Sequence, residues 1–406
     1  MARELSCLPS SVPVMSPIRL LLASAALGPL HALAAPSGSP RQVASYTGNP
    51  LADVQMSPSA PYADKIRTLA IPRLSPELAA KAAKVAEVPS FQWLDARDKI
   101  PLLNETLAAI REANRAGASP PFAATYVVYN FPDRDCSAKA SAGELVLADG
   151  GLAKYEKEFI DPIAALIDEY SDVRQVIVYE PDGLANLVTN MEVERCANAA
   201  PAYLSATEYA LRAFDRPNAA VYLDAGHAGW LGWDSNLAPT ARVYGAAYRR
   251  AGSPKAVRGL VTNVSNFNAW NTSVQFDYTV PNDNWDESKF HAALAPHLAE
   301  EGFPARFIVD QGRSGRQPTG RDSWAEWCNI KGAGFGARPS ADTGVETLDA
   351  FVWVKPGGEA DGTSDTAAER YDERCGSNSS LIPAPEAGAW FQEYFVMLLQ
   401  NANPPF

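Results

Sequence analysis

The feature that most constrains the fold is a repeated pair of elements, a short apolar run ending in polar or acidic residues and then a longer stretch with helical spacing. The apolar runs are Phe91–Asp95, Thr125–Asn130, Gln175–Asp182, Ala220–His227, Gly259–Asn266, Arg306–Gly315 and Ala350–Asp361. Between them, Ala165–Tyr170, Leu204–Phe214 and Glu287–Glu301 place apolar residues at i, i+3 and i+4, as amphipathic helices do. The chain therefore alternates between strand-like and helix-like segments.

Strands that are buried on both faces and alternate with helices predict a parallel sheet. Seven such units favour an α/β fold, a distorted (β/α) barrel of about seven parallel strands. An open doubly wound sheet is the alternative that the pattern alone leaves open. In a barrel the carboxyl ends of the strands converge on one face, and we expect the active site there.

The N-terminus is typical of a secreted protein. Arg19 precedes the apolar run Leu20–Leu30, and small residues follow at Ala32–Ala34. We predict that residues 1–34 are a signal peptide, with Met15 as an alternative start. Residues 35–60 are rich in Pro, Ser and Gly and are expected to form a flexible lead-in, and residues 61–406 are expected to form one catalytic domain.

Charge and cysteine content narrow the class of protein. A formal charge of −12 and a pI near 4.9 argue against a nucleic-acid partner or an anionic membrane surface. Outside the predicted signal peptide there are four cysteines, and an even number in a secreted chain predicts two disulfides. Three pairings are possible, and pairing by sequence neighbours would join Cys136 to Cys196 and Cys328 to Cys375.

Acidic residues dominate the ends of the predicted strands, where Asp95, Asp135, Asp182, Asp224, Asp310 and Asp361 occur. Trp93, Trp230, Trp233 and Trp327 lie near the same ends. Facing carboxylates suit cleavage of a glycosidic bond, because one group must donate a proton while another acts on water or on the sugar. Indole faces suit the apolar faces of sugar rings. The combination predicts a glycosidase, although Asp182 alone could cap a helix and a single Trp or His227 could be structural.

Other chemistries lack their motifs. Gly312–Arg316 is not the nucleophile elbow of a serine hydrolase, and Gly332–Ala337 does not have dinucleotide-binding spacing. Asp133–Glu144 lacks the glycine of a calcium-binding EF-hand loop, and the histidines are dispersed. We therefore predict no metal and no cofactor.

Several long segments resemble the cellobiohydrolases of glycoside hydrolase family 6. They are Val127–Glu144, Val176–Asn190, Val221–Trp233, Phe351–Asp365 and Ala387–Phe406, and the resemblance covers the chain from about residue 60 onward. It implies a loop-covered substrate tunnel at the strand ends. It also implies a secreted, monomeric, exo-acting cellulase that hydrolyses β-1,4-glucan with inversion and releases cellobiose from non-reducing ends. Its partners would be cellulose and cello-oligosaccharides, bound without a cellulose-binding module.

The resemblance also assigns roles. Asp182 would be the general acid, Asp135 a supporting acid and Asp361 the candidate base. Tyr129 would press on the distorted sugar, Ser141 would help to hold the water, and Arg134 completes the catalytic set. The residues implied to bind substrate are Trp93, Asp224, His227, Trp230, Trp233, Asn266, Trp327, Lys355 and Glu359. The resemblance supports the pairings Cys136–Cys196 and Cys328–Cys375.

Exo action is favoured over endo action by the long segment Lys355–Gly388, which a bridge from Cys375 to Cys328 would tether over the cleft. An endo-β-1,4-glucanase on the same scaffold is the first alternative. A non-catalytic β-glucan-binding protein that has kept the tunnel is the second.

Overall fold

The computed structural model describes residues 42–406, so the predicted signal peptide lies outside the described residues. The strands are β1 Gln55–Met56, β2 Gln92–Leu94, β3 Phe122–Val128, β4 Gln175–Tyr179, β5 Ala219–Asp224, β6 Val257–Thr262, β7 Phe307–Asp310 and β8 Leu348–Val352. The α-helices are α1 Ala60–Lys65, α2 Pro76–Val85, α3 Ile100–Arg115, α4 Gly151–Lys154, α5 Asp161–Glu169, α6 Gly183–Thr189, α7 Glu194–Ala213, α8 Asp234–Arg250, α9 Glu287–Glu300 and α10 Gln392–Gln400. Short 3₁₀ and π turns lie at η1 Ile66–Ala70, η2 Ile71–Arg73, η3 Arg97–Lys99, η4 Leu147–Asp149, η5 Tyr155–Ile160, η6 Asp277–Thr279 and η7 Glu373–Gly376.

Every strand pairing in residues 42–406 is parallel. The strands from β3 to β8 follow one another in chain order, and β1 and β2 both pair with β3. The strands β2 and β8 are not paired with each other. The segments next to them are joined by a hydrogen bond from the backbone N–H of Phe91 to the carbonyl of Trp353, at 3.0 Å. The predicted distorted barrel is confirmed, and each of the seven predicted runs overlaps a strand.

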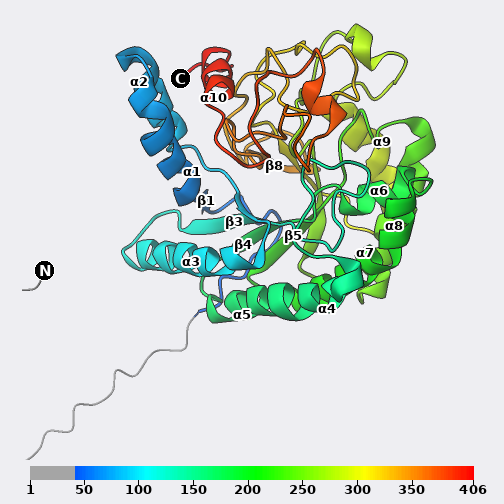
Figure 1. The fold of residues 1–406 in the computed structure, drawn as a ribbon. Coiled ribbons are helices and arrows are strands. Elements are labelled where there is room, and N and C mark those ends of the chain that lie inside the picture. The colour runs from blue at the N-terminus through cyan, green and yellow to red at the C-terminus, as the bar shows by residue number, and fades with distance from the viewer. Residues whose placement is uncertain (1–41) are drawn as a thin grey trace, which may run out of the picture. The chain divides into compact units, whose positions relative to one another are not determined.

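Alternation along the strands divides the core into two parts. In β4, Val176 and Val178 belong to the cluster that fills the barrel interior, whereas Ile177 and Tyr179 belong to the cluster under the outer helices. Successive side chains of a strand point to opposite faces, so a run of five buried residues is a strand covered on both faces. Helices α3, α5, α7, α8 and α9 form the outer layer (Figure 1).

Residues 42–60, which we expected to belong to a flexible lead-in, contact the barrel instead. The Leu51 side chain is buried in the interior cluster, and the Asn49 amide donates to the carbonyl of Asp349 at 2.7 Å. Gln55 and Met56 add β1 to the lower edge of β3. The apolar side chains Tyr46, Leu51, Val54 and Met56 explain this packing, because they cover apolar surface at the bottom of the barrel.

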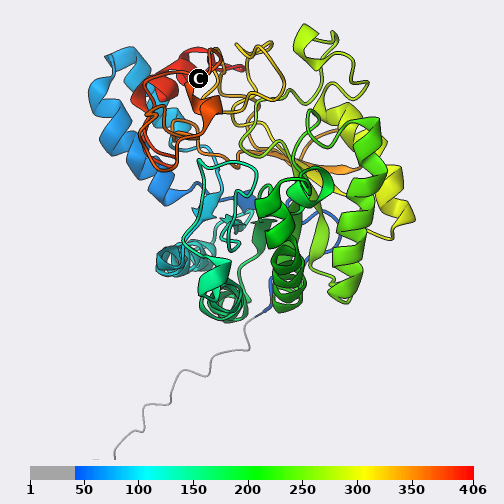
Figure 2. The same cartoon turned by 45° about the vertical axis from the view of Figure 1, so that its right-hand side comes forward.

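A second apolar cluster joins the two ends of the described chain. Helix α2 and the π turn η1 pack against α10, as the blue and red segments show in Figure 1. The long loops after β7 and β8, residues 311–347 and 353–391, gather beside α10, and Figure 2 shows them from a second side. No helix within residues 42–406 is long and apolar enough to cross a lipid bilayer.

Each disulfide anchors a loop that follows a strand, the first the loop after β3 and the second the loop after β7. Cys136, in the loop after β3, pairs with Cys196 of α7. Cys328, in the loop after β7, pairs with Cys375 of η7. The structure therefore pairs the four cysteines in the way that the resemblance implied.

Candidate active site

A cavity of about 450 Å³ lies at the carboxyl ends of the strands. It is the place where the fold brings together most of the residues that the sequence singled out. Those that line it are Trp93, Tyr129, Asp135, Ser141, Asp182, His227, Trp230, Asn266, Trp327, Lys355 and Asp361. They come from the ends of β2 to β6 and from the loops after β7 and β8, as expected for a barrel enzyme.

Asp182 lies on a tight turn between β4 and α6. Glu180 and Asp182 both have a positive φ, 46° and 66°. At position 182 this suits the residue type, because Asp tolerates a positive φ better than most residues. The backbone N–H of Asp182 donates to the Asp224 carboxylate at 2.8 Å, which holds the turn. The next residue is Gly183, and a residue with a side chain would not fit there, because its Cβ would lie 2.5 Å from the ring of Phe131. Strand, turn and helix together therefore place the Asp182 side chain in the cavity wall.

The environment of Asp182 favours a protonated carboxyl group. Burial, with a smaller contribution from the negative charge of Asp135, raises its pKa to about 7. A carboxyl group that keeps its proton at mildly acidic pH can donate it.

Asp135 occupies the loop after β3, also with a positive φ of 62°. The backbone N–H of Ser141 donates to its Oδ2 at 2.7 Å. Burial raises the pKa of Asp135, and this hydrogen bond opposes the rise because it stabilises the ionised form. Asp135 can therefore hold a charge that acts on Asp182.

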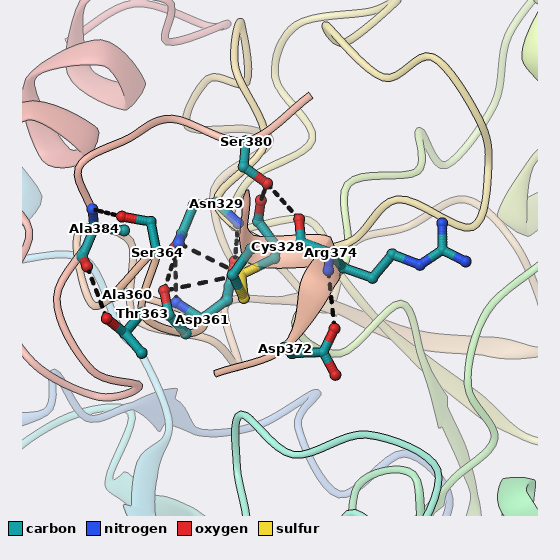
Figure 3. The surroundings of a disulfide bond; sticks show 12 residues. Cys328, Asn329, Ala360, Asp361, Thr363, Ser364, Asp372, Arg374, Ser380 and Ala384 are labelled. Carbon is teal, nitrogen blue, oxygen red and sulfur yellow. Dashed lines mark hydrogen bonds between the residues drawn. A yellow bond between two sulfur atoms is a disulfide. The ribbon is translucent and has the colours of Figure 1, made fainter. Parts of the chain in front are cut away.

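Asp361 lies in the loop after β8 and is held by cations. Nη1 of the buried Arg313 lies 2.8 Å from each carboxylate oxygen of Asp361, and Lys355 Nζ lies 3.9 Å from one of them. Asn329 and Asp361 also exchange two hydrogen bonds, each from a backbone N–H to the other side chain, beside the Cys328 disulfide (Figure 3). The two cations compensate the buried negative charge, so Asp361 differs from Asp182 in its electrostatic surroundings.

Tyr129 lines the cavity at the end of β3, and its ring lies over the guanidinium of Arg134 at 4.3 Å. Arg134 does not line the cavity. Its guanidinium donates to the backbone carbonyls of Asp95, Tyr129 and Ser141, so it holds together the loop that carries Asp135.

The indole N–H groups of Trp93 and Trp230 are hydrogen-bonded to other parts of the protein. Trp93 Nε1 donates to the carbonyl of Val354 at 2.8 Å, and Trp230 Nε1 donates to Thr189 Oγ1 at 2.7 Å. These bonds fix the ring orientations and leave apolar ring surface as the contact that the wall offers. The cavity therefore combines carboxyl groups with fixed aromatic surfaces.

Among residues 42–406, no group of three or more His, Cys, Asp or Glu side chains is arranged to hold a metal ion.

Sequence comparison identifies the family. The profile of the glycosyl hydrolases family 6 matches residues 51–402. The chain belongs to this family.

Curated relatives and solved structures of family 6 agree over most of the chain. "1,4-beta-D-glucan cellobiohydrolase CEL6A" of Podospora anserina is 56% identical over 364 residues, which are 89% of this chain and 75% of that protein. The catalytic core domain of the cellobiohydrolase Cel6A from Chaetomium thermophilum has a TM-score of 0.88 and 57% identity, over 89% of this chain and 100% of that one. Cellobiohydrolase II (Cel6A) of Humicola insolens, solved in complex with glucose and cellotetraose, has a TM-score of 0.88 and 55% identity, over 88% and 100%.

In this family 6 chain, four residues of the predicted set lie outside the cavity wall. Besides Arg134 they are Asp224, Trp233 and Glu359. Asp224 accepts from the backbone N–H groups of Asp182 and Gly226, so it shapes two turns instead. Glu359 pairs with Lys65 of α1 at 2.6 Å. The Trp233 ring lies behind Trp324, with centroids 6.4 Å apart.

Sequence reasoning missed several residues of the wall. One of them is Trp324, which belongs to a loop with no periodic pattern. Two others are Asn186, one helical turn after Asp182 in α6, and Asn190, two turns after it and just beyond the end of α6. The helical spacing after Asp182 was the signal that could have found the two asparagines. For Trp324 the sequence offers no such signal, because its place depends on how a long loop folds.

Proposed function

We propose that this family 6 chain is a secreted, exo-acting cellulase that hydrolyses β-1,4-glucan with inversion and releases cellobiose from non-reducing chain ends. The observation that carries the proposal is the raised pKa of Asp182, about 7, in a cavity that also holds the cation-paired Asp361. One carboxyl group is ready to donate a proton and another is ionised, as inverting glycosidases require. The relatives named as cellobiohydrolases support the choice of substrate.

In the proposed mechanism Asp182 donates its proton to the glycosidic oxygen as the bond from that oxygen to the anomeric carbon breaks. A water attacks the anomeric carbon from the opposite face and loses its proton toward Asp361, the candidate base. Asp135 supports the protonated state of Asp182 before the step through its negative charge. Tyr129 and the tryptophans hold the sugar units on both sides of the reacting bond.

The loops at the cavity support exo action. We call residues 355–388 the roof segment. It meets the loop after β3, because the Asp372 carboxylate accepts from the backbone N–H of Lys139 at 3.3 Å and Ala140 packs against the Cys328–Cys375 disulfide. Arg374 of the roof segment lines the cavity. A chain held under two joined loops has to enter by its end.

Disulfides suit an oxidising compartment, and they support secretion, which the N-terminal residues also predict. We also propose that the enzyme acts as a monomer and that its partners are cellulose and cello-oligosaccharides.

The test is the variant Asp182→Ala with cellohexaose as substrate. Loss of the proton donor should lower kcat by at least about 10²-fold while binding is retained. Asp234→Ala, an exposed residue at the start of α8, serves as control and should keep full activity. Proton NMR of the first product should show the α anomer, because inversion reverses the β configuration.

Unchanged turnover in Asp182→Ala would refute the assignment of the donor. A wild-type protein that binds cellohexaose without hydrolysing it would instead establish the non-catalytic alternative. Loss of carboxymethylcellulose viscosity ahead of cellobiose release would favour endo action.

A further inference from the structure

A buried polar cluster lies behind the cavity wall and has no part in the mechanism above. It consists of Asn268, Arg321 and Glu287, which are 3%, 5% and 0% exposed. Asn268 contacts His227 and Trp324, and Arg321 donates to Asn266 Oδ1 at 3.0 Å. These three neighbours all line the cavity, so the cluster is placed to control the geometry of the wall.

The side-chain amide of Asn268 can adopt only one orientation. Its Oδ1 accepts from Arg321 Nη2 and from Trp324 Nε1, each at 2.8 Å. Both of these groups can only donate. Its Nδ2 donates to the Glu287 carboxylate at 2.8 Å. A flipped amide would set its NH₂ group against the two donors Arg321 Nη2 and Trp324 Nε1, so the flip is excluded whether or not Glu287 is protonated.

The fixed amide determines the state of the His227 ring. Nδ1 of His227 lies 3.2 Å from Asn268 Nδ2 and 3.1 Å from the backbone N of Gly229. Both neighbours are donors, so Nδ1 has to accept and the ring proton has to be on Nε2. Burial, with a smaller effect of the Arg321 charge, lowers the pKa of His227 to about 3, which keeps the ring neutral. Nε2 has no hydrogen-bond partner among residues 42–406 and is not fully buried.

We propose that Asn268, held by Arg321 and Glu287, is a positioning residue that fixes His227 as the Nε2–H tautomer, so that the ring always donates a hydrogen bond to an oxygen of the bound sugar. The identity of that ligand rests on the proposed function. The same amide oxygen fixes the Trp324 indole, so one side chain sets a polar and an apolar part of the sugar site together.

The first test is the tautomer itself, which needs no substrate. In wild-type protein labelled with ¹⁵N-histidine, a long-range ¹H–¹⁵N spectrum should show His227 with a protonated Nε2 and an unprotonated Nδ1 at pH 5 to 7. A His227→Asn variant assigns the signals. An Nδ1–H tautomer or an imidazolium in the wild-type protein would overturn the proposal.

The second test compares two substitutions of buried asparagines. Asn268→Asp keeps the shape but removes the N–H groups that face His227 and Glu287. Asn218→Asp is the matched control, because the Asn218 amide donates to the carbonyls of Ile167, Tyr170 and Val173 and none of these residues lines the cavity. Both variants are destabilised by a new buried carboxylate. Only Asn268→Asp should change the His227 nitrogen shifts.

Binding of cellotetraose is then measured by calorimetry in an Asp182→Asn background, which prevents turnover. Asn268→Asp should weaken binding about tenfold, the size expected for losing one or two hydrogen bonds, while Asn218→Asp should not. Unaltered His227 shifts in a folded Asn268→Asp protein would overturn the proposal. If Asn268→Asp does not fold, the wild-type spectrum decides the question. If no protein binds cellotetraose, the proposed function fails while the tautomer result still decides this inference.

Discussion

At the scale of single residues, three aspartates with the same side chain differ in what surrounds them. Burial and a neighbouring charge raise the pKa of Asp182, and among residues 42–406 no hydrogen bond opposes the rise. Asp135 is also buried but accepts a backbone N–H from Ser141. Asp361 is paired with Arg313. The division of labour between acid and base therefore depends on each aspartate's partners.

The pH profile should report this arrangement. A general acid must be protonated, so kcat/KM on cellohexaose should fall as the pH rises through about 7. Asp135→Asn removes a negative charge that raises the pKa of Asp182, so the alkaline limb should move to lower pH. The shift should be smaller than the whole rise, because burial is the larger cause. The readout is the position of the limb, since the variant also loses activity.

Asp133→Asn is the matched control, because Asp133 lies in the same loop and its Oδ1 accepts from the Leu147 N–H, which an amide oxygen can also do. Asn also tolerates the φ of 54° at this position. An equal shift in both variants, or a limb that moves to higher pH in Asp135→Asn, would contradict the electrostatic link.

At the scale of elements, the sequence predicted the strands and much of the wall, because burial on both faces leaves an unbroken apolar run. The predicted runs extend past the strands, however. In the run Ala350–Asp361, only the residues up to Val352 belong to β8, and the remaining residues form the loop that carries Asp361. β1 has two residues and no apolar run, so it was not predicted. Trp324 and the cluster of Asn268, Arg321 and Glu287 were missed because contacts between distant loops leave no periodic pattern.

The roof segment provides a prediction at this scale. Replacing both Cys328 and Cys375 by Ser should free the roof segment from the loop after β7. The expected loss of stability is about 2–4 kcal/mol. Internal cuts should also become more frequent, so the ratio of carboxymethylcellulose viscosity loss to cellobiose release should rise several-fold. Viscometry and product chromatography on the same samples measure the ratio.

The control variant Ile167→Ala tests whether a loss of stability alone, without release of the roof segment, changes this ratio. Ile167 is fully buried in α5, away from the roof segment, and its truncation should cost about 2–5 kcal/mol. It should leave the ratio unchanged. If both variants raise the ratio equally, or neither does, the tether does not control access to the cavity.

At the scale of the whole molecule, the described chain buries several carboxyl groups around the cavity at the barrel's carboxyl end. Sequence position predicted that Asp135, Asp182 and Asp361 gather there, because parallel strands end on one face. It could not predict their state of protonation, which depends on burial by loops after β3, β7 and β8. It also could not predict that residues 42–56 fill the lower end of the barrel, since Leu51 and Tyr46 lie in a segment whose composition is typical of a linker.

Buried acids should make the protein most stable at acidic pH. Burial raises the pKa of Glu180, Asp182 and Glu287 to about 7 in each case. Their unfolded pKa values lie near 4, so between about pH 4 and pH 7 the folded chain binds more protons than the unfolded chain at these three groups. Two buried histidines, His227 and His291, have pKa values lowered to about 3 and offset part of this effect below pH 6.5. The free energy of unfolding should therefore fall as the pH rises through this window and level off above pH 7. Urea unfolding at pH 5, 6, 7 and 8 measures the slope.

Glu287→Gln should flatten that slope. Oε1 of Glu287 accepts from the backbone N–H of Ala228 and from Asn268 Nδ2, and an amide oxygen can accept both bonds. The variant therefore keeps the contacts and loses only the titration, and the slope should decrease by up to about 1.4 kcal/mol per pH unit. Glu112→Gln, at an exposed position of α3, should leave the slope as it is in the wild-type protein. A Glu287→Gln slope equal to that of the wild-type protein would show that this buried acid is ionised throughout the window.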